Sequence, residues 1–336
     1  MPHPRRDPAA RPGDAVFVEA PARLHFGMLD LRGSLGRRFG GIGAAIPVPS
    51  LLLEAASAES LRADGPSSDR ALEFARRFSE YHGLERGAHL RVHAAIPSHS
   101  GLGSGTALAL AVARAMAELY GIPADPPALA RAVGRAKRSA VGTYAFAEGG
   151  FVVEGGRWPE SDDPAPRLAR FAIPERWRCV VAIPSGTSGV SGDAEVSAFA
   201  RLPPPPERSA MRVSHLVLMA LLPALVDGDL CAFGRALTEV QCINGRWFAP
   251  VQGGAFAPGV GTGLVAKMTE WGAAGVGQSS WGPAVFGIVD GDPAAEELAG
   301  RVRAEMGKGG GVVHATSFAN SGARVWRDAP SAGKAR

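Results

Sequence analysis

The passage LRVHAAIPSHSGLGSGTALALAVARAMAELYG, residues 90–121, contains the clearest structural signals of the chain. Its first part alternates apolar residues with other side chains, which predicts a strand, and Pro97 ends that strand. Its last part, residues 106–119, repeats apolar residues at helical spacing, which predicts a helix that Gly121 caps. The sequence therefore predicts a strand, a glycine loop and a helix in direct succession.

The loop of this unit, PSHSGLGSGT at residues 97–106, has the composition of a phosphate-binding loop. Glycines leave backbone N–H groups free, and the N-terminus of the following helix adds partial positive charge. The hydroxyls of Ser104 and Thr106 are candidate phosphate contacts or magnesium ligands. The spacing is neither the Walker A pattern GxxxxGKS/T nor GxGxxG. A tight strand-to-helix turn without a ligand is the alternative interpretation.

Strand-like and helix-like stretches alternate along the rest of the chain without an internal repeat, which predicts a mixed α and β protein of two domains. We place the domains at residues 14–175 and 176–327, and flexible tails at residues 1–13 and 328–336. Further helices are predicted at residues 70–81, 127–138, 209–226, 229–243, 262–271 and 293–306. Further strands are predicted at VFVEA (16–20), FVVE (151–154), CVVAIP (179–184), VFGIV (285–289), GVVHAT (311–316) and ARVW (323–326).

Composition excludes several classes of protein. The chain has 336 residues, of which 46% are hydrophobic and 20% charged, and its net charge of +4 is too small and too scattered for a nucleic-acid surface. The longest apolar run, near residues 213–226, is interrupted by polar residues and Pro223, so we expect no membrane span. Three cysteines without a CxxC pair, and no apolar leader, favour the cytoplasm. Small anions are the expected partners.

Two further glycine clusters are candidate ligand contacts. FGGIGAA, residues 39–45, follows Arg37 and Arg38, whose guanidinium groups match carboxylate or phosphate. AGVGQSSWGP, residues 274–283, precedes a predicted strand. A solvated basic turn is the alternative interpretation of the first cluster, and a flexible turn that of the second.

PARLHFGMLD (residues 21–30), PSHSGLGSG and GVGQSSWG resemble, in this order, the three motifs of the galactokinase, homoserine kinase, mevalonate kinase and phosphomevalonate kinase (GHMP) superfamily. Within it, the chain is similar to the β-ribofuranosylaminobenzene 5'-phosphate synthase family over about residues 16–326. RRFGGIGAAI, GRAKRSAVGTYAFAEGGFVVEGG, WRCVVAIPSG and FAPVQGG add to the similarity. The resemblance implies an α+β, GHMP-kinase-like fold, with a left-handed βαβ crossover in the N-terminal domain and a ferredoxin-like C-terminal domain.

The resemblance also implies a reaction. In that family, 5-phosphoribosyl 1-diphosphate is joined to a 4-substituted benzoate, 4-aminobenzoate or 4-hydroxybenzoate, at the ring carbon that bears the carboxylate. Carbon dioxide and diphosphate are released. The step belongs to tetrahydromethanopterin biosynthesis and one-carbon metabolism, and Mg²⁺ is the expected cofactor. The substituent of the acceptor and the oligomeric state stay open, and a homodimer is compatible with the sequence.

The candidate site residues follow from the three motifs and the arginines near them. We assign the glycine loop to the diphosphate, with Ser104 also as a magnesium ligand, direct or through water: Gly101, Leu102, Gly103, Ser104, Gly105 and Thr106. The expected catalytic residues are Arg23, His25, His99 and Arg138. The other expected substrate contacts are Arg37, Arg38, Gly40, Gly41, Ser139, Gln252, Gly277, Gln278, Ser279 and Ser280, with Trp281 stacked on the ring. His25 is alternatively a core histidine. Lys137 and Arg138 are alternatively the cationic last turn of the helix at residues 127–138.

An ATP-dependent small-molecule kinase of the same superfamily is the main alternative function. Such kinases commonly place a carboxylate near the segment that corresponds to RSAVGTYAF, residues 138–146, where it deprotonates the acceptor hydroxyl. This segment contains no carboxylate, and Glu148 lies beyond it. An attacking ring carbon has no proton to lose before attack, so the absence favours the transferase. A non-catalytic phosphosugar sensor is a third alternative, which the glycine loops and arginine segments disfavour.

Overall fold

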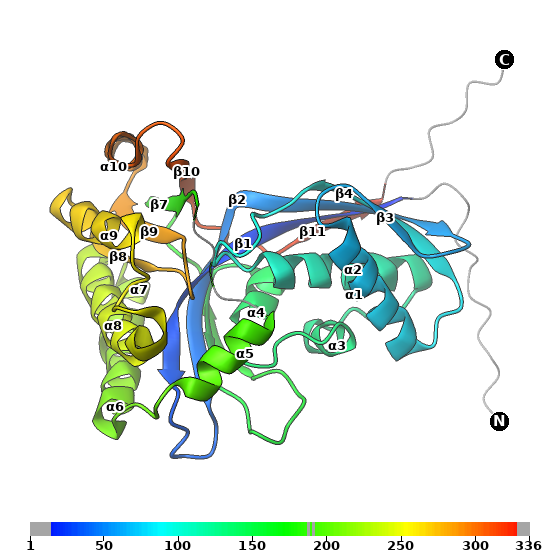
Figure 1. Ribbon diagram of the computed structural model, residues 1–336, viewed down its shortest axis with the longest axis horizontal. Coiled ribbons are helices and arrows are strands. Elements are labelled where there is room, and N and C mark those ends of the chain that lie inside the picture. The colour runs from blue at the N-terminus through cyan, green and yellow to red at the C-terminus, as the bar shows by residue number, and fades with distance from the viewer. Residues whose placement is uncertain (1–14, 187–188, 190–191, 328–336) are drawn as a thin grey trace.

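The structure, a computed structural model, describes residues 15–186, 189 and 192–327. Two β-sheets with flanking helices build the molecule, the larger mostly from the first half of the chain and the smaller from the second (Figure 1). The predicted tails at residues 1–13 and 328–336 lie outside the described residues. The predicted α+β architecture is confirmed.

The larger sheet has seven strands and is organised around a long antiparallel hairpin. Its strands are β1 (Val16–Asp30), β2 (Phe39–Ala58), β3 (Arg62–Asp64), β4 (Gly87–Ala94), β5 (Phe151–Glu154), β6 (Arg167–Phe171) and β11 (Arg324–Arg327). β2 pairs with β1, β4 and β5, and β3 lies parallel to β4. β11, at the end of the predicted second domain, pairs with β1. The first motif is therefore strand throughout, and it continues well beyond the predicted VFVEA.

Four helices lie on one side of this sheet (Figure 1). They are α1 (Ser68–His82), α2 (Ser104–Tyr120), α3 (Pro126–Ala132) and α4 (Val141–Glu148). α2 buries most of its surface because alanine and leucine fill it, and Gly121 caps it with an N–H bond to Ala117 O. The predicted order of strand, glycine loop and helix is confirmed.

The helix predicted at residues 127–138 is wrong at its C-terminal end, because it stops at Ala132. Gly134 and Ala136 adopt left-handed backbone angles, with φ of 67° and 60°, and such angles interrupt a helix. Lys137 and Arg138 consequently lie in the connection to α4 and do not form a cationic helix terminus.

The smaller sheet has the strand order β10–β7–β9–β8, and all its neighbours are antiparallel. Its strands are β7 (Trp177–Pro184), β8 (Gly275–Gln278), β9 (Val285–Asp290) and β10 (Gly311–Ser317). The helices of this half are α5 (Gly192–Arg201), α6 (Glu207–Leu216), η1 (Val217–Leu221), α7 (Leu222–Asp227), α8 (Leu230–Gln252), α9 (Val260–Glu270) and α10 (Asp292–Met306). Helices separate β7 from β8 and β9 from β10, and the resulting βαββαβ order confirms the ferredoxin-like prediction.

One stretch of the described residues, Glu207–Asp227, is long and apolar enough by length and composition to cross a membrane. It comprises α6, η1 and α7, and it buries Val213, Leu221 and Leu225 in the core that α8 shares. Core helices of folded domains satisfy the same criterion, so the stretch is weak evidence for a membrane span.

Candidate active site

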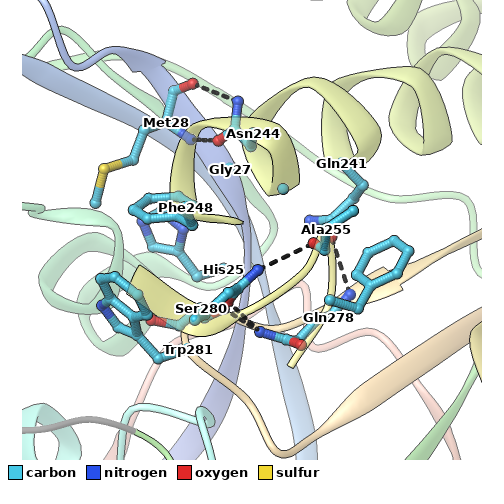
Figure 2. Close-up of a pocket in the computed structure, with 13 residues that line it drawn as sticks. His25, Gly27, Met28, Gln241, Asn244, Phe248, Ala255, Gln278, Ser280 and Trp281 are labelled. Carbon is cyan, nitrogen blue, oxygen red and sulfur yellow. Dashed lines mark hydrogen bonds between the residues drawn. The ribbon is translucent and has the colours of Figure 1, made fainter. Parts of the chain in front are cut away.

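A pocket that spans about 430 Å³, including space open to solvent, lies where β1 of the larger sheet meets α8 and the third motif (Figure 2). Its lining residues are His25, Gly27, Met28, Gln241, Asn244, Gly245, Phe248, Gln252, Ala255, Phe256, Gln278, Ser280 and Trp281. The Asn244 side chain accepts a bond from Met28 N–H (2.5 Å) and donates one to Met28 O (3.1 Å). Gln241 donates to Phe26 O (2.6 Å) and accepts from Gln278 N–H (2.9 Å). These amide bonds fix the two sheets around the pocket.

Aromatic side chains form one wall of this pocket. The rings of Phe248 and Trp281 lie 4.8 Å apart, and Phe199 of α5 meets both edge-on, at 5.9 and 5.4 Å. A second hollow of about 620 Å³ shares Gln278 and Trp281 with the first. Flat apolar ligands suit such walls because aromatic side chains stack well and lose little conformational freedom.

The glycine loop packs against the opposite side of the third motif. Ser279 Oγ donates to Gly101 O (2.8 Å), and a Cβ atom at Gly101, where φ is +86°, would lie 2.3 Å from the Ser279 carbonyl oxygen. Arg23 donates its backbone N–H to Leu102 O (3.1 Å) and its guanidinium to Gly101 O. The structure thus joins the three predicted motifs at the loop, and no side chain fits at position 101.

Arginine side chains converge on the start of α2. Arg135 Nη2 donates to Thr106 Oγ1 (3.0 Å), and a Cβ atom at Gly105 would lie 2.5 Å from Arg70 Nη2. Burial lowers the pKa of Arg23 to about 10 and also lowers the pKa of Arg135, whose Nε has no hydrogen-bond partner in the described part of the chain. Buried guanidinium groups with unmet donors favour an anion.

Arg70 and Arg135 were not expected from the sequence, because they come from α1 and from the turn after α3. One negative charge reaches this arginine cluster from α5, where Glu195 pairs with Arg138 at 2.5 Å. The Arg138 guanidinium also lies 5.3 Å from the Phe199 ring. Glu195 opposes the pKa decrease of Arg23, but one carboxylate does not neutralise four arginines.

His25 lies between the loop and the pocket. Its Nε2 is 3.1 Å from Ser139 Oγ, and its backbone N–H donates to Ser279 Oγ (3.0 Å). Burial, assisted by the positive charge of Arg23, lowers the pKa of His25 to about 3. The imidazole is therefore neutral near pH 7 and can accept or relay a proton without holding a charge.

A carboxylate does lie beside residues 138–146, and it comes from a neighbouring strand. Glu154, the last residue of β5, is completely buried, and its Oε2 accepts the Gly156 N–H (2.8 Å). Its Oε1 has no hydrogen-bond partner of standard geometry among the described residues. Burial raises the pKa of Glu154 to about 7, although Gly156 N–H, Ser139 and Ala140 N–H oppose the rise. The segment alone gave no sign of this carboxylate, because strand pairing places it there.

Arg37 and Arg38 are not among the lining residues of the two hollows. Arg37 donates to Gly156 O (2.9 Å) and lies 5.0 Å from the Trp158 ring, and Arg38 donates to Leu31 O (3.1 Å). Both guanidinium groups thus hold the turn before β2. Gly40, the second residue of β2, adopts a φ of 65°.

The remaining predicted residues are spread around the loop and the pocket. His99 adopts a φ of 56°, and its carbonyl accepts the Gly189 N–H (2.7 Å). Gln252 donates to Gly254 O (2.8 Å), and a Cβ atom at Gly277 would lie 2.5 Å from the Gln241 side chain. The absence of a side chain at Gly277 therefore allows α8 to pack closely against β8.

The donor set determines how Mg²⁺ could be held here. The described residues contain no group of three or more His, Cys, Asp or Glu side chains that could hold a metal ion. Mg²⁺ often keeps several waters and binds through substrate phosphates with one or two protein oxygens. Ser104 is the first residue of α2, and its hydroxyl could supply one such oxygen. The residues fit a magnesium ion carried by a diphosphate.

Comparison with known proteins identifies the class first. Residues 69–150 match the GHMP kinases N terminal domain, and residues 221–308 match the GHMP kinases C terminal family. Homoserine kinase from Cytophaga hutchinsonii superimposes with a TM-score of 0.70 over 93% of this chain and 97% of its own, at 19% identity. Mevalonate kinase from L. major gives 0.68 over 90% and 96%, at 14% identity. The fold is that of the GHMP kinases.

Closer relatives are synthases. The chain is 35% identical over 315 residues to the β-ribofuranosylphenol 5'-phosphate synthase of Methanothermobacter thermautotrophicus, which covers 88% of this chain and 94% of the relative. The enzyme of the same name from Archaeoglobus fulgidus is 35% identical over 286 residues, 81% of this chain and 87% of its own. The chain belongs to the β-ribofuranosylphenol 5'-phosphate synthase family, which confirms the predicted family.

Proposed function

We propose that this protein transfers the phosphoribosyl group of 5-phosphoribosyl 1-diphosphate to 4-hydroxybenzoate, with release of carbon dioxide and diphosphate. The name of the relatives specifies a phenol product. Decarboxylation of 4-hydroxybenzoate leaves a phenol, whereas 4-aminobenzoate would leave an aniline. The observation that supports this function best is the contact of Ser279 with both sides of the site, since it joins the arginine-lined loop to the aromatic pocket.

The loop side suits the diphosphate. The N-terminus of α2 and the guanidinium groups of Arg23, Arg70 and Arg135 offer positive charge where the leaving group develops negative charge. Mg²⁺, when bound to the diphosphate with Ser104, would neutralise part of this charge. The C–O electron pair of ribose C1 leaves with the diphosphate.

The pocket side suits the aromatic acceptor. The ring lies against Trp281 and Phe248. We assign its carboxylate to Arg138, whose guanidinium lies 5.3 Å from the Phe199 ring that packs on this aromatic wall. The ring carbon forms the new C–C bond to ribose C1, and the electron pair of the carboxylate bond returns to the ring as carbon dioxide leaves. Arg138 already pairs with Glu195, so it holds the benzoate weakly. Weak binding of this group is useful, because the carboxylate must depart as a neutral molecule.

A kinase of the same superfamily is the less supported alternative. The homoserine kinase and mevalonate kinase structures share 19% and 14% identity with this chain, a similarity that shows the fold alone. Glu154 is not among the residues that line the pockets, so a substrate alcohol there would not meet it directly.

We further propose a cytoplasmic enzyme of tetrahydromethanopterin biosynthesis that acts on small molecules. An exposed free thiol at Cys231 and a buried one at Cys179 suit a reducing compartment. Light scattering on the purified protein tests whether it forms a homodimer.

The experiment that tests the function combines the protein, Mg²⁺, 5-phosphoribosyl 1-diphosphate and carboxyl-labelled 4-hydroxybenzoate without ATP. Stoichiometric release of labelled carbon dioxide and diphosphate is the expected result. A parallel reaction with 4-aminobenzoate tests the choice of acceptor. Formation of ADP from ATP and an alcohol, without carbon dioxide from either benzoate, would establish the kinase.

A further inference from the structure

Glu154 is a completely buried carboxylate that has no role in the transfer of the phosphoribosyl group as proposed. It pairs across the sheet with Gly41 of β2, while His25 of β1 pairs with Gly43 of the same strand. Opposite partners project from the same face of a sheet, so His25 and Glu154 both face the start of α4 across two glycines. The missing side chain at Gly41 leaves space for Glu154 Oε1 and Ser139 Oγ, and the missing side chain at Gly43 leaves space for Val141 of α4.

Ser139 lies between these two side chains. Its Oγ is 3.1 Å from His25 Nε2, and a Cβ atom at Gly41 would lie 3.2 Å from that oxygen and 2.9 Å from Glu154 Oε1. The same Oε1 is the buried oxygen that lacks a standard hydrogen bond among the described residues. His25 lines the pocket, so polar atoms lead from the pocket to the buried carboxylate.

We propose that His25, Ser139 and Glu154 form a proton relay for the para-hydroxyl group of the acceptor, an inference that rests on the proposed function. As the ring attacks ribose C1, the O–H electron pair moves into the ring, and the proton passes to the His25 nitrogen that does not meet Ser139. The Nε2 proton passes to Ser139, and the Ser139 proton to Glu154. When carbon dioxide leaves, the phenolate recovers a proton along the same path. No proton is consumed overall.

The electrostatics of the three residues suit this exchange. The pKa of Glu154, raised to about 7 by burial, allows the carboxylate to take up and return a proton near neutral pH. The pKa of His25, lowered to about 3, means that the imidazole passes the proton on. The ionisable groups on the elements around the relay are Arg23 of β1, which lowers the pKa of His25, Tyr144 of α4, Arg157 after β5, and Arg167 of β6, which pairs with Glu148.

The test compares Glu154→Gln and Ser139→Ala with wild-type protein, and Thr143→Val serves as a matched control. Thr143 is equally buried on α4, and its hydroxyl also lacks a partner in the described region. The wild-type kcat with 4-hydroxybenzoate should rise with pH around 7, where Glu154 becomes able to accept a proton. Each relay variant should lower kcat on the order of 10²-fold and remove that rise, while KM for 5-phosphoribosyl 1-diphosphate stays within about two-fold. Thr143→Val should keep both kcat and its pH profile.

The outcomes separate the two proposals. Wild-type protein that releases no carbon dioxide overturns the proposed function. Active wild-type protein with a flat pH profile of kcat overturns the relay alone, and so does Glu154→Gln with unchanged kcat. If Glu154→Gln does not fold, Ser139→Ala decides, because it leaves the carboxylate in place and interrupts the path.

Discussion

The loop side and the pocket side of the site bury ionisable groups with opposite results. Around the glycine loop, Arg23 and Arg135 are buried and stay charged, because even the lowered pKa of Arg23 is about 10. On the pocket side, buried His25 has a pKa of about 3 and is neutral near pH 7, and buried Glu154 has a pKa of about 7 and is partly protonated there. The same desolvation produces an anion site on one side and a proton-exchanging path on the other, because the starting pKa values differ.

The largest effect is expected where the two sides meet. Gly101→Ala would place a Cβ atom 2.3 Å from Ser279 O at a φ of +86°. We expect the free energy of unfolding to fall by about 3 kcal/mol or more, with loss of turnover, because both contact and backbone angle are unfavourable. Urea denaturation measures the change. Gly300→Ala, in α10 with open space around it, is the control and should stabilise slightly. If Gly101→Ala and Gly300→Ala have equal free energies of unfolding, the close contact between Gly101 and Ser279 does not stabilise the junction of the loop side and the pocket side.

The buried ionisable groups on the pocket side predict that the free energy of unfolding depends on pH. The folded pKa of Glu154, about 7, exceeds the ordinary glutamate pKa of 4.5, so stability present at low pH is lost as the pH rises from 4.5 to 7. The loss is at most about 3 kcal/mol. Glu154→Gln should abolish it, as measured by urea denaturation at several pH values. His25 acts in the opposite direction, since its folded pKa is depressed and stability is lost below pH 6.5. Parallel pH curves for wild type and Glu154→Gln would contradict the assignment.

Removal of one arginine on the loop side should have a smaller effect, on the affinity for diphosphate. Arg135→Met removes one donor to the anion and also relieves repulsion from Arg70. We expect the affinity for inorganic diphosphate to fall about 10-fold to 100-fold, and the free energy of unfolding not to decrease. Titration calorimetry and urea denaturation measure the two quantities. Arg301→Met, at an exposed ion pair on α10, should change neither substantially. Lower stability with unchanged affinity would make Arg135 a structural residue.

The smallest effect is expected at α5, which contacts both sides. Phe199 packs edge-on against Trp281 and lies near the Arg138 guanidinium. Phe199→Leu should raise KM for the benzoate about three-fold and leave KM for 5-phosphoribosyl 1-diphosphate unchanged, because edge contacts contribute about 1 kcal/mol. Steady-state kinetics with each substrate varied separates the two constants. An equal increase in both would indicate that α5 supports the site as a whole.

The two sides also differ in how far the sequence predicts them. The glycine loop is predictable because its residues are consecutive and lie between a strand and a helix. Arg70, Arg135 and Glu154 were missed, because each comes from a separate element and no local pattern marks it. Glu154 ends the apolar strand FVVE, which is a weak sign in the sequence of a buried carboxylate. Only the pairing of β5 with β2 shows where this carboxylate lies.

The helices and strands also differ in this way: those set by local sequence spacing were predicted, and those set by contacts with distant residues were not. The helices at residues 70–81 and 293–306 were predicted to within two residues, since their apolar spacing is regular. The first motif was not recognised as strand, because β1 contains Pro21 and two register shifts against β2. GVGQ was not predicted as a strand, because its glycines resemble a turn, and it forms β8, where those glycines allow α8 to pack closely.

The pairing of β11 with β1 has a consequence for protein synthesis. During synthesis, Val16–Glu19 of β1 remain unpaired on this edge until β11 is made. Arg324, the first residue of β11, is added 308 residues after Val16. At roughly 5–20 residues per second, the edge of β1 stays open for roughly 15–60 s. An open edge invites pairing with other chains. A chain released before Arg324 would keep that edge exposed, so β11 protects β1 from pairing with other chains.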